Sequence, residues 1–439
     1  MSATMKSSKA AAGAPGLVRV MTRRDLTALA VNGIIGAGIF GLPATAARLL
    51  GYASPLGFIL CAAVVFVFVL CFAEVASHFT ETGGPYLYGR TIFGSFVGFE
   101  VGWTVWLARV SAFATNSNIL VAYLSFFIPQ VGAGAARAAV LIAVPALLAL
   151  INARGVAGGA RFGVVFAAAK LAALILFAAV GLAYVDWGRV SDMSIPANAN
   201  WGVAILGLIY TFTGFEYAVI PAAEAKDPRR DLGWSLIAAL SVCAVIYLAV
   251  QFVALGTLPM NELTASARPL ADAGRSFLGP LAGGLISLLA CVSVIGNLSA
   301  LVLVSPRLTL AFSERGDFPA IFGRLHATYG TPVVSILFFT AVGSVLAIYG
   351  TFEWLVLLSV LARLANYIVT CAAAPILRKR MPPPKFRLPL GAVIPLIGMA
   401  LCVWLFLQAP NNTKLAFLYA CLAGAALYVV RGRRERSSD

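Results

Sequence analysis

The sequence predicts an all-α polytopic membrane protein with twelve transmembrane helices. Of its 439 residues, 61% are hydrophobic and only 11% are charged, and the mean hydropathy is +0.92. Soluble globular domains do not have this composition. Apolar runs of roughly 18 to 25 residues, long enough to cross about 30 Å of hydrocarbon, recur along the chain. The twelve runs begin near residues 26, 54, 97, 136, 161, 201, 233, 281, 332, 353, 388 and 412.

Residues 1–25 come before the first run and are polar and basic, without the apolar core and cleavage site of a signal peptide. We expect them to form a cytoplasmic tail. If the segments between runs alternate between the two sides, 23 of the 32 Lys and Arg residues share the side of this tail and six lie opposite. The positive-inside rule then puts both termini, including residues 431–439, in the cytoplasm.

This pattern predicts a multi-pass protein of the cytoplasmic (inner) membrane. The net charge of +15 is explained by attraction to anionic lipid headgroups, so we expect the lipid bilayer and no nucleic acid among its partners. The oligomeric state is not indicated by the sequence.

Residue types that carry metal or nucleotide chemistry are scarce. The seven cysteines lie in apolar runs without CxxC spacing, and His78 and His326 form no HExxH motif. No GxxxxGK[ST] phosphate loop occurs. We therefore expect no metal site, no cofactor, no enzyme activity and no primary pump.

The first run contains an interruption between Val31 and Pro43, VNGIIGAGIFGLP, with glycines at Gly33, Gly36 and Gly38. Glycine is the weakest non-proline helix former and proline lacks a backbone donor. We predict two half-helices joined by an unwound turn. Such backbone at membrane depth must be buried in protein or line a watery cavity. The alternative is close packing of intact helices through small residues.

The sixth run contains a matching interruption between Tyr210 and Pro221, YTFTGFEYAVIP, where Gly214 precedes the carboxylate of Glu216. Paired interrupted helices in corresponding positions of two repeats indicate the substrate site of a secondary transporter. Half-helix ends are positive at the N-terminus and negative at the C-terminus. This field suits a zwitterion such as an α-amino acid.

Runs one and six correspond if residues 26–185 and 201–380 are two five-helix repeats. Because five is odd, the second repeat would be inverted in the membrane relative to the first. Residues 388–430 then hold two additional helices outside the repeats.

Four segments resemble the amino acid-polyamine-organocation (APC) superfamily of amino acid permeases, in order and in one register from about Asp25 to Arg380. The segments are GAGIFGLP, ETGGPYLYGRTIFG, GFEYAVIPAAEAKDPRRDL and SERGDFP. The resemblance implies the LeuT-like five-plus-five inverted repeat with spans one and six unwound. It also implies transport of an amino acid by alternating access.

The resemblance further implies which positions contact a substrate. Amides of the glycine-rich turn hold the carboxylate, carbonyls of spans one and six take the ammonium, and two side chains face the substrate side chain. These substrate-binding positions are Ile34, Gly36, Ala37, Gly38, Tyr210, Thr213, Gly214, Phe215 and Leu301. Relatives often carry serine where Ala37 stands, so only a backbone contact is expected there. Some carry a gating tryptophan where Leu301 stands, which puts that gate in doubt.

Lys170 lies within the fifth run, where an ionisable residue is costly and is a functional candidate. In sodium-coupled relatives the resemblance implies a sodium ion between spans one, five and eight, and Lys170 resembles a stand-in for that ion. Its ammonium would bond to first-span carbonyls near Gly33 and to Ser299. Transport would then be independent of sodium and coupled to protons or exchange. The alternative is that Lys170 snorkels or pairs structurally.

Three further charges lie within the runs. Glu216 would tie the half-helices of span six together, or respond to protonation. Arg109 and Arg363 need partners, which the sequence does not name.

The predicted function is thus a secondary active transporter whose partners are an amino acid and, if transport is proton-coupled, protons. Neutral or small amino acids are favoured because Glu216 is the only obvious acidic residue near the site. The alternatives are a polyamine or organic cation exchanger, a channel, or a transport-inactive amino acid sensor on the same fold.

Overall fold

The computed structural model describes residues 21–79, 84–155, 159–218, 227–382 and 386–435. Most of the predicted N-terminal tail, the last four residues and Pro221 lie outside these ranges. Within the ranges every regular element is a helix, which confirms the all-α prediction.

Helices occupy all twelve predicted runs, and the remaining short helices connect them. In chain order the elements are α1 (Arg23–Ile34), α2 (Gly38–Leu50), η1 (Gly51–Ala53), α3 (Ser54–His78), α4 (Gly84–Phe93), α5 (Ser95–Leu124), η2 (Pro129–Gly132), α6 (Gly134–Ala153), α7 (Gly159–Gly181), η3 (Leu182–Tyr184), α8 (Trp187–Ser191), α9 (Trp201–Phe212), η4 (Phe215–Ala218), α10 (Pro228–Thr257), α11 (Met260–Ala265), α12 (Pro269–Val304), α13 (Pro306–Glu314), η6 (Ala320–Gly323), α14 (Val333–Tyr349), α15 (Phe352–Arg380), α16 (Val393–Gln408) and α17 (Asn411–Glu435).

Six helical stretches of the described chain are long and apolar enough to cross a membrane by themselves. They are Gly38–His78, Gly134–Ala153, Arg230–Thr257, Pro269–Glu314, Phe352–Arg380 and Asn411–Val430. Four shorter apolar helices accompany them, at Lys170–Tyr184, Trp201–Phe212, Val333–Tyr349 and Val393–Gln408. The composition therefore fits a polytopic membrane protein.

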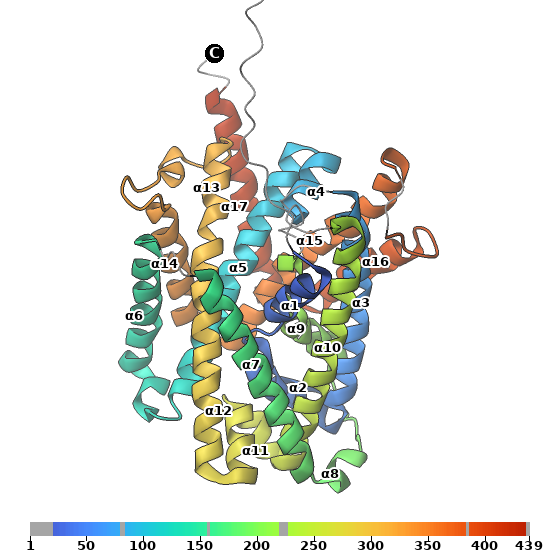
Figure 1. Cartoon of the computed structure of the whole chain (residues 1–439), viewed down its shortest axis with the longest axis vertical. Coiled ribbons are helices and arrows are strands. Elements are labelled where there is room, and N and C mark those ends of the chain that lie inside the picture. Colours follow the sequence, from blue (N-terminus) through green and yellow to red (C-terminus); the bar gives the residue numbers. More distant parts are fainter. Residues whose placement is uncertain (1–20, 80–83, 156–158, 219–226, 383–385, 436–439) are drawn as a thin grey trace, which may run out of the picture.

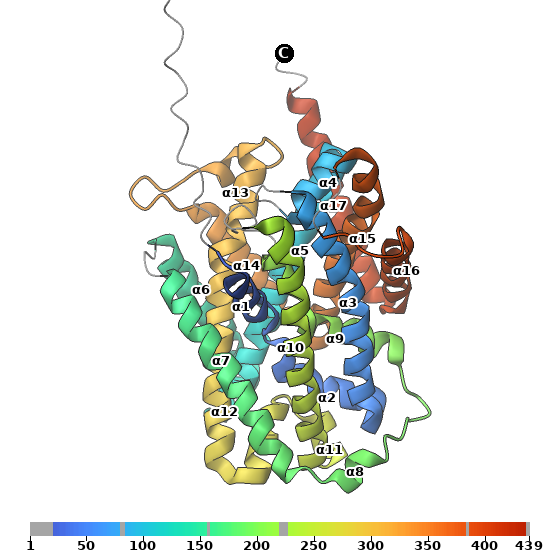
Figure 2. The same cartoon turned by 45° about the vertical axis from the view of Figure 1, so that its right-hand side comes forward.

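The long helices run lengthwise through the molecule and surround a group of short ones (Figures 1 and 2). Helices α1, α2 and α9 lie in the middle, with α5, α7, α10 and α12 beside them. Helices α4 and α13 lie at the end where the C-terminus leaves the molecule, and α8 and α11 lie at the opposite end. The short central helices are the products of the two predicted interruptions.

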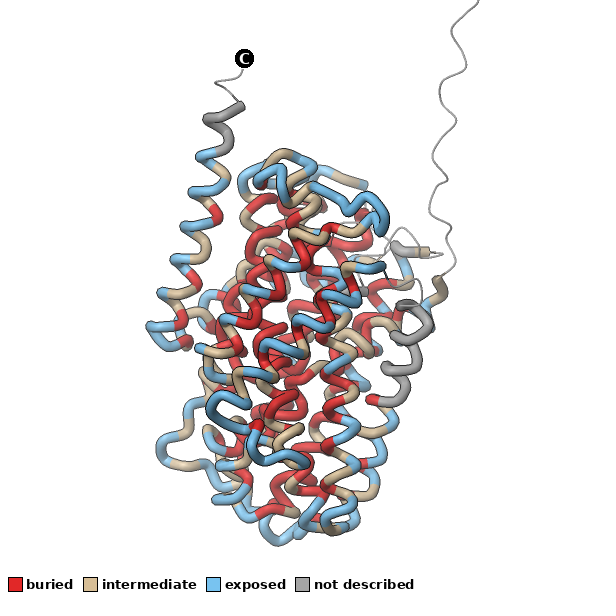
Figure 3. Tube along the Cα trace, turned by 90° about the vertical axis from the view of Figure 1, so that its left-hand side faces the viewer, coloured by how far each residue is buried: buried red, intermediate tan, exposed pale blue. Residues whose placement is uncertain are grey.

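Burial follows the pattern expected in lipid. Figure 3 shows buried residues along the inner faces of the helices and exposed ones around the outside. Outward apolar side chains such as Leu176, Val245 and Leu281 are 63%, 69% and 77% exposed, a cost in water that a bilayer removes. Helix α15 instead buries polar groups, among them Ser359 and Asn366. Polar residues inside the bundle therefore mark where function can be sought.

Candidate functional site

The first interruption separates α1 from α2. Helix α1 ends at Ile34 and α2 begins at Gly38, and the Gly36 amide donates to the Ile34 carbonyl at 2.8 Å. The amides of Ala37, Gly38 and Ile39 donate to no backbone carbonyl of the described residues. They are the free donors of a helix N-terminus, where an anion is favoured.

The second interruption follows α9. Gly214 has φ of +108°, a conformation that L side chains rarely adopt. Its amide donates to Glu216 Oε2 at 2.8 Å, and the Thr213 hydroxyl donates to the Tyr210 carbonyl at 2.9 Å. The chain then continues into η4 at Phe215. The Glu216 carboxylate therefore holds the turn that separates α9 from η4.

The two interruptions touch each other. A β-carbon built on Gly214 would lie 2.1 Å from the Gly33 carbonyl oxygen, so position 214 has no room for a side chain. A β-carbon on Gly38 would lie 3.0 Å from Thr211 Cα and from the Tyr210 ring. Gly38 and Gly214 thus lie both at the breaks in the helices and at close contacts between the two interrupted segments.

A cavity of about 370 Å³, here called the central cavity, lies against both interruptions. Its described lining comes from α1, α5, α9, α12 and α15 and from the turns that follow α1, α9 and α12. The residues are Leu29, Asn32, Gly33, Ile34, Gly36, Ala37, Arg109, Ala112, Asn116, Tyr210, Thr213, Gly214, Asn297, Ala300, Leu301, Val304, Ser305 and Arg363. Seven of the nine predicted substrate-binding positions are among them. Cavities of this size hold small ligands in other proteins, roughly 300 to 1,000 Å³.

The other two predicted positions do not line the central cavity. Gly38 packs on α9, as described above. Phe215 is completely buried, with its ring centroid 5.2 Å from that of Phe72 and 5.7 Å from that of Tyr367. The expectation that Phe215 faces a substrate does not match this position, because the left-handed Gly214 turns the chain so that Phe215 packs toward α3 and α15.

Lys170 of α7 is 5% exposed, and its ammonium reaches the end of α1. Its Nζ donates to the carbonyls of Asn32 at 2.7 Å and Ile35 at 2.6 Å, and to Asn297 Oδ1 at 3.4 Å. Asn32 and Ile35 lie on either side of Gly33, near which the resemblance implied these contacts. The contact from α12 comes from Asn297 instead of the expected Ser299, which is half-buried two residues further on.

Carbonyls at the end of α1 are therefore largely occupied. Besides the two that accept from Lys170, the Ile34 carbonyl accepts from the Tyr247 hydroxyl at 3.0 Å as well as from the Gly36 amide. Carbonyls at a helix C-terminus lack helical partners. Here side chains of α7 and α10 supply them.

Arg363 of α15 pairs with Glu216, at 3.0 Å between Nε and Oε1. The two side chains are 6% and 16% exposed. The guanidinium also donates to Ser359 Oγ at 2.8 Å and to the Ala108 carbonyl at 3.4 Å. Glu216 is thus a partner of Arg363, and this ion pair ties the second interruption to α15.

Three buried polar atoms of the central-cavity residues have no hydrogen-bond partner among the described residues: Asn116 Oδ1, Asn297 Nδ2 and Ser305 Oγ. An unsatisfied buried polar group costs roughly 1 to 3 kcal/mol, which a polar ligand would recover. No sequence motif marks these side chains. The only signal was their polarity within apolar runs.

On the other side of the first interruption, aromatic and aliphatic side chains close the space around α2. The Tyr123 hydroxyl donates to the Phe40 carbonyl at 2.7 Å. A β-carbon on Gly41 would lie 2.7 Å from both Ile119 and Phe352. Phe40, Gly41, Ile119, Tyr123 and Phe352 are here called the α2 seal. Helix α2, around which these residues gather, lies below α1 on the side away from the C-terminus (Figure 1).

A metal site needs several ligating side chains in one place. Among the described residues, no three His, Cys, Asp or Glu side chains come together in a way that could hold a metal ion. The central cavity therefore offers amide, hydroxyl and guanidinium groups to a ligand.

Comparison with known proteins agrees with this architecture. Residues 22–427 match the family model described as amino acid permease. The chain is 29% identical over 436 residues to the methylthioribose transporter of Bacillus subtilis, covering 95% of this chain and 94% of the relative. It is 26% identical over 455 residues to the branched-chain amino acid permease BcaP of the same organism, covering 97% and 96%. With BcaP of Lactococcus lactis the identity is 27% over 451 residues, covering 95% of each chain.

The family match begins just before α1 and ends within α17, so it includes both interruptions and every residue of the central cavity. The chain belongs to the amino acid permease family of the APC superfamily and is an integral membrane protein.

Proposed function

We propose that this protein is a secondary active transporter that carries amino acids across the cytoplasmic membrane by alternating access. The proposal includes twelve spans, two inverted five-helix repeats, unwound segments in spans one and six, and cytoplasmic termini. One observation carries it: two interrupted helices meet at Gly33 and Gly214 beside a central cavity of about 370 Å³. The free amide of Ala37, which lines that cavity at the start of α2, would take the substrate carboxylate.

The charge of the central cavity favours a neutral substrate over a diamine. Its described lining contains Arg109 and Arg363 and no carboxylate. A polyamine would meet these guanidinium groups, and the Glu216 carboxylate is already paired with Arg363. Leu29, Ala300 and Leu301 offer an apolar wall. Branched-chain amino acids, the substrates named for two relatives, fit this lining.

A second candidate substrate is an uncharged polar molecule such as methylthioribose, named for another relative. The specific observation in its favour is that Lys170 and Tyr247 already occupy the carbonyls of Asn32, Ile34 and Ile35. Fewer acceptors are then left for a substrate ammonium. The unpartnered polar atoms at the cavity would suit sugar hydroxyls equally well.

The purified protein in proteoliposomes distinguishes these functions. We expect saturable uptake and counterflow of radiolabelled leucine, competition by other neutral amino acids, and no competition by putrescine. Competition by methylthioribose alone would favour the second candidate. Ligand-dependent thermal stabilisation without any flux would indicate a sensor, and flux without counterflow a channel.

Lys170 supports the proposal that transport is independent of sodium. Its ammonium, bonded to the carbonyls at the end of α1, would fill the position of a coupling cation. We expect leucine accumulation to follow a proton gradient or an opposing substrate gradient. Accumulation driven by sodium alone would contradict this part of the proposal.

A further inference from the structure

A second cavity, of about 330 Å³, lies beyond the central cavity on the side of α4 and α13. Arg109, Val304 and Arg363 line both cavities and form the wall between them. Two of the helices that line it, α4 and α13, lie at the end of the molecule from which the C-terminus emerges (Figures 1 and 2). It is here called the arginine vestibule.

The arginine vestibule is strongly cationic. Four of its described lining residues are arginines, Arg109, Arg307, Arg315 and Arg363, against one carboxylate, Glu216. That carboxylate is already paired with Arg363. Arg109 and Arg363 are each 5% exposed at the inner wall, whereas Arg307 and Arg315 are exposed. Arginine side chains therefore line the cavity from the surface to the wall of the central cavity.

Two further carboxylates of the described residues, Asp317 and Glu314, are near the vestibule but not part of its lining. Asp317, beside α13, lies 4.0 Å from Arg90 of α4, so it faces a cation of its own. Glu314 is exposed on α13 and is not part of the described vestibule lining. Guanidinium groups bind carboxylates in a planar two-bond geometry. An anion with carboxylate chemistry is what this arrangement would recognise.

The vestibule also has an aromatic wall. The Arg315 guanidinium lies over the Tyr86 ring, 4.7 Å from its centroid, and the Phe312 ring centroid is 6.2 Å from that of Tyr86. Stacking on Tyr86 holds the Arg315 side chain in place. A ligand with an apolar body and a carboxylate head would pack on the rings and pair with the arginines. A small inorganic anion would leave the apolar wall unused.

We propose that the arginine vestibule is a second binding site for an organic carboxylate with an apolar body, entered from the cytoplasm. The proposal rests on the proposed transport function, because the ligand would pass to or from the central cavity between Arg109 and Arg363. Two sources share this chemistry. One is the transported amino acid on its way out, and the other is a separate cytosolic carboxylate.

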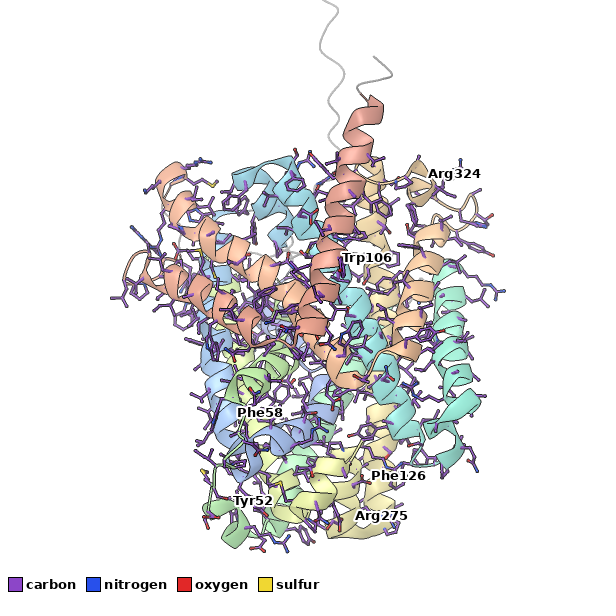
Figure 4. The ribbon with its side chains drawn as sticks, turned by 180° about the vertical axis from the view of Figure 1, so that it is seen from behind. Tyr52, Phe58, Trp106, Phe126, Arg275 and Arg324 are labelled. Atoms are coloured by element: carbon purple, nitrogen blue, oxygen red, sulfur yellow. The ribbon has the colours of Figure 1, made fainter. Side chains whose placement is uncertain are left out.

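The test uses the full-length protein with Arg307→Gln and Arg315→Gln together, two exposed side chains whose loss leaves the core intact. The probes are leucine, 3-phenylpropanoate, which lacks an ammonium, and phenethylamine, which lacks a carboxylate. Arg324→Gln is the matched control, because Arg324 is exposed at the same end of the molecule (Figure 4) and is not among the vestibule residues.

We expect 3-phenylpropanoate to bind the wild type and the control, and to bind the double variant at least fivefold more weakly by titration calorimetry. Phenethylamine should not bind at the vestibule. If the vestibule receives the transported amino acid, leucine binds with a stoichiometry of two in the wild type and one in the double variant. Suppose instead that leucine binds with a stoichiometry of one in the wild type and in the double variant, while 3-phenylpropanoate still binds the wild type. The ligand of the vestibule is then a separate carboxylate.

The proposal is overturned if 3-phenylpropanoate fails to bind the wild type, or binds the double variant and the wild type equally. The proposed transport function has a separate readout, because it fails only if proteoliposomes carry no leucine. A protein that binds 3-phenylpropanoate at the vestibule but carries no leucine would keep the site and lose the transport proposal.

Discussion

Lys170 joins three helices through one ammonium group. Its bonds to Asn32, Ile35 and Asn297 link α7 to the end of α1 and to α12. An ammonium buried to this degree is costly unless donors and acceptors are matched. Two carbonyls and one amide oxygen match its three donors. These three contacts hold α7 and α12 to the first interruption.

We expect Lys170→Ala to reduce leucine turnover at least tenfold while changing leucine affinity less than threefold. The variant removes the link between α7 and α1 without touching the free amides of α2. Proteoliposome flux and thermal-shift titration measure the two quantities. Lys414→Ala is the control, since Lys414 of α17 bonds to the Leu407 carbonyl away from the cavity. Unchanged flux in Lys170→Ala would assign Lys170 a purely structural role.

The ion pair between Glu216 and Arg363 is buried. Replacing one partner should lower the stability of the protein more than replacing both. Loss of one member of a buried pair typically costs about 3 to 5 kcal/mol, because the other charge stays unpaired. We expect Glu216→Gln and Arg363→Gln each to lower the midpoint of thermal unfolding strongly. The double variant should recover part of the loss.

A double-mutant cycle on the four proteins measures this coupling by thermal unfolding in detergent. Strict additivity of the two single losses would mean that the ion pair contributes nothing. The exposed pair between Arg189 and Asp186, at 3.0 Å with side chains 46% and 51% exposed, is the reference. There we expect a coupling of about 0 to 1 kcal/mol.

At the scale of helices, the sequence was informative where backbone rules apply. Glycine and proline predicted interruptions within Val31–Pro43 and Tyr210–Pro221, because weak helix formers act locally. The structure ends α1 at Ile34 and begins α2 at Gly38. Which side chains surround the breaks depends on the packing of distant helices. Asn116 and Asn297 belong to no motif. Only the resemblance implied that Phe215 faces the substrate, and the left-handed Gly214 before it sets a side-chain direction that spacing does not give.

The contact between the two interruptions gives an element-scale prediction. We expect Gly214→Ala to destabilise the protein far more than Gly94→Ala. Both glycines have a positive φ, +108° and +90°, so both variants incur backbone strain of about 1 to 3 kcal/mol. Only at Gly214 does the β-carbon also overlap a backbone atom, 2.1 Å away at Gly33, whereas nothing lies within 4 Å at Gly94.

Thermal unfolding midpoints and the yield of monodisperse protein measure the difference. Equal losses in the two variants would mean that the backbone around Gly33 moves aside easily. In that case the two interruptions would not be rigidly joined.

At the scale of the whole molecule, the two cavities lie on one side of the first interruption and the α2 seal on the other. An additional ion pair joins the ends of α2 and α15, between Arg48 and Glu353. Its side chains are 48% and 45% exposed, so it should contribute about 0 to 1 kcal/mol. With the cytoplasmic termini proposed above, this arrangement would be closed toward the outside and accessible from the cytoplasm.

We expect Glu353→Gln to shift the population toward a conformation open to the outside by twofold to fivefold, the change that a contribution of up to about 1 kcal/mol allows. A cysteine introduced at Ile119, 3% exposed in the α2 seal, reports this opening through its rate of labelling by a membrane-impermeant thiol reagent. Of the seven native cysteines, six are buried and Cys421 is half-buried.

Asp186→Asn is the control for this experiment, since it removes an exposed ion pair that does not join α2 to α15. It should leave the labelling rate of the introduced cysteine unchanged. A faster rate in both variants would point to a general loosening of the fold, and no change in either would mean that the ion pair does not hold the seal.

If the protein transports by alternating access, as proposed, the contact of Gly214 with Gly33 has a mechanical consequence. Two backbone segments pressed together without side chains between them can rotate about the point of contact, but they cannot slide past it. Helices on either side can therefore swing in opposite directions around a fulcrum beside the ligand. A ligand bound there would stay at the centre of rotation while the protein moves around it.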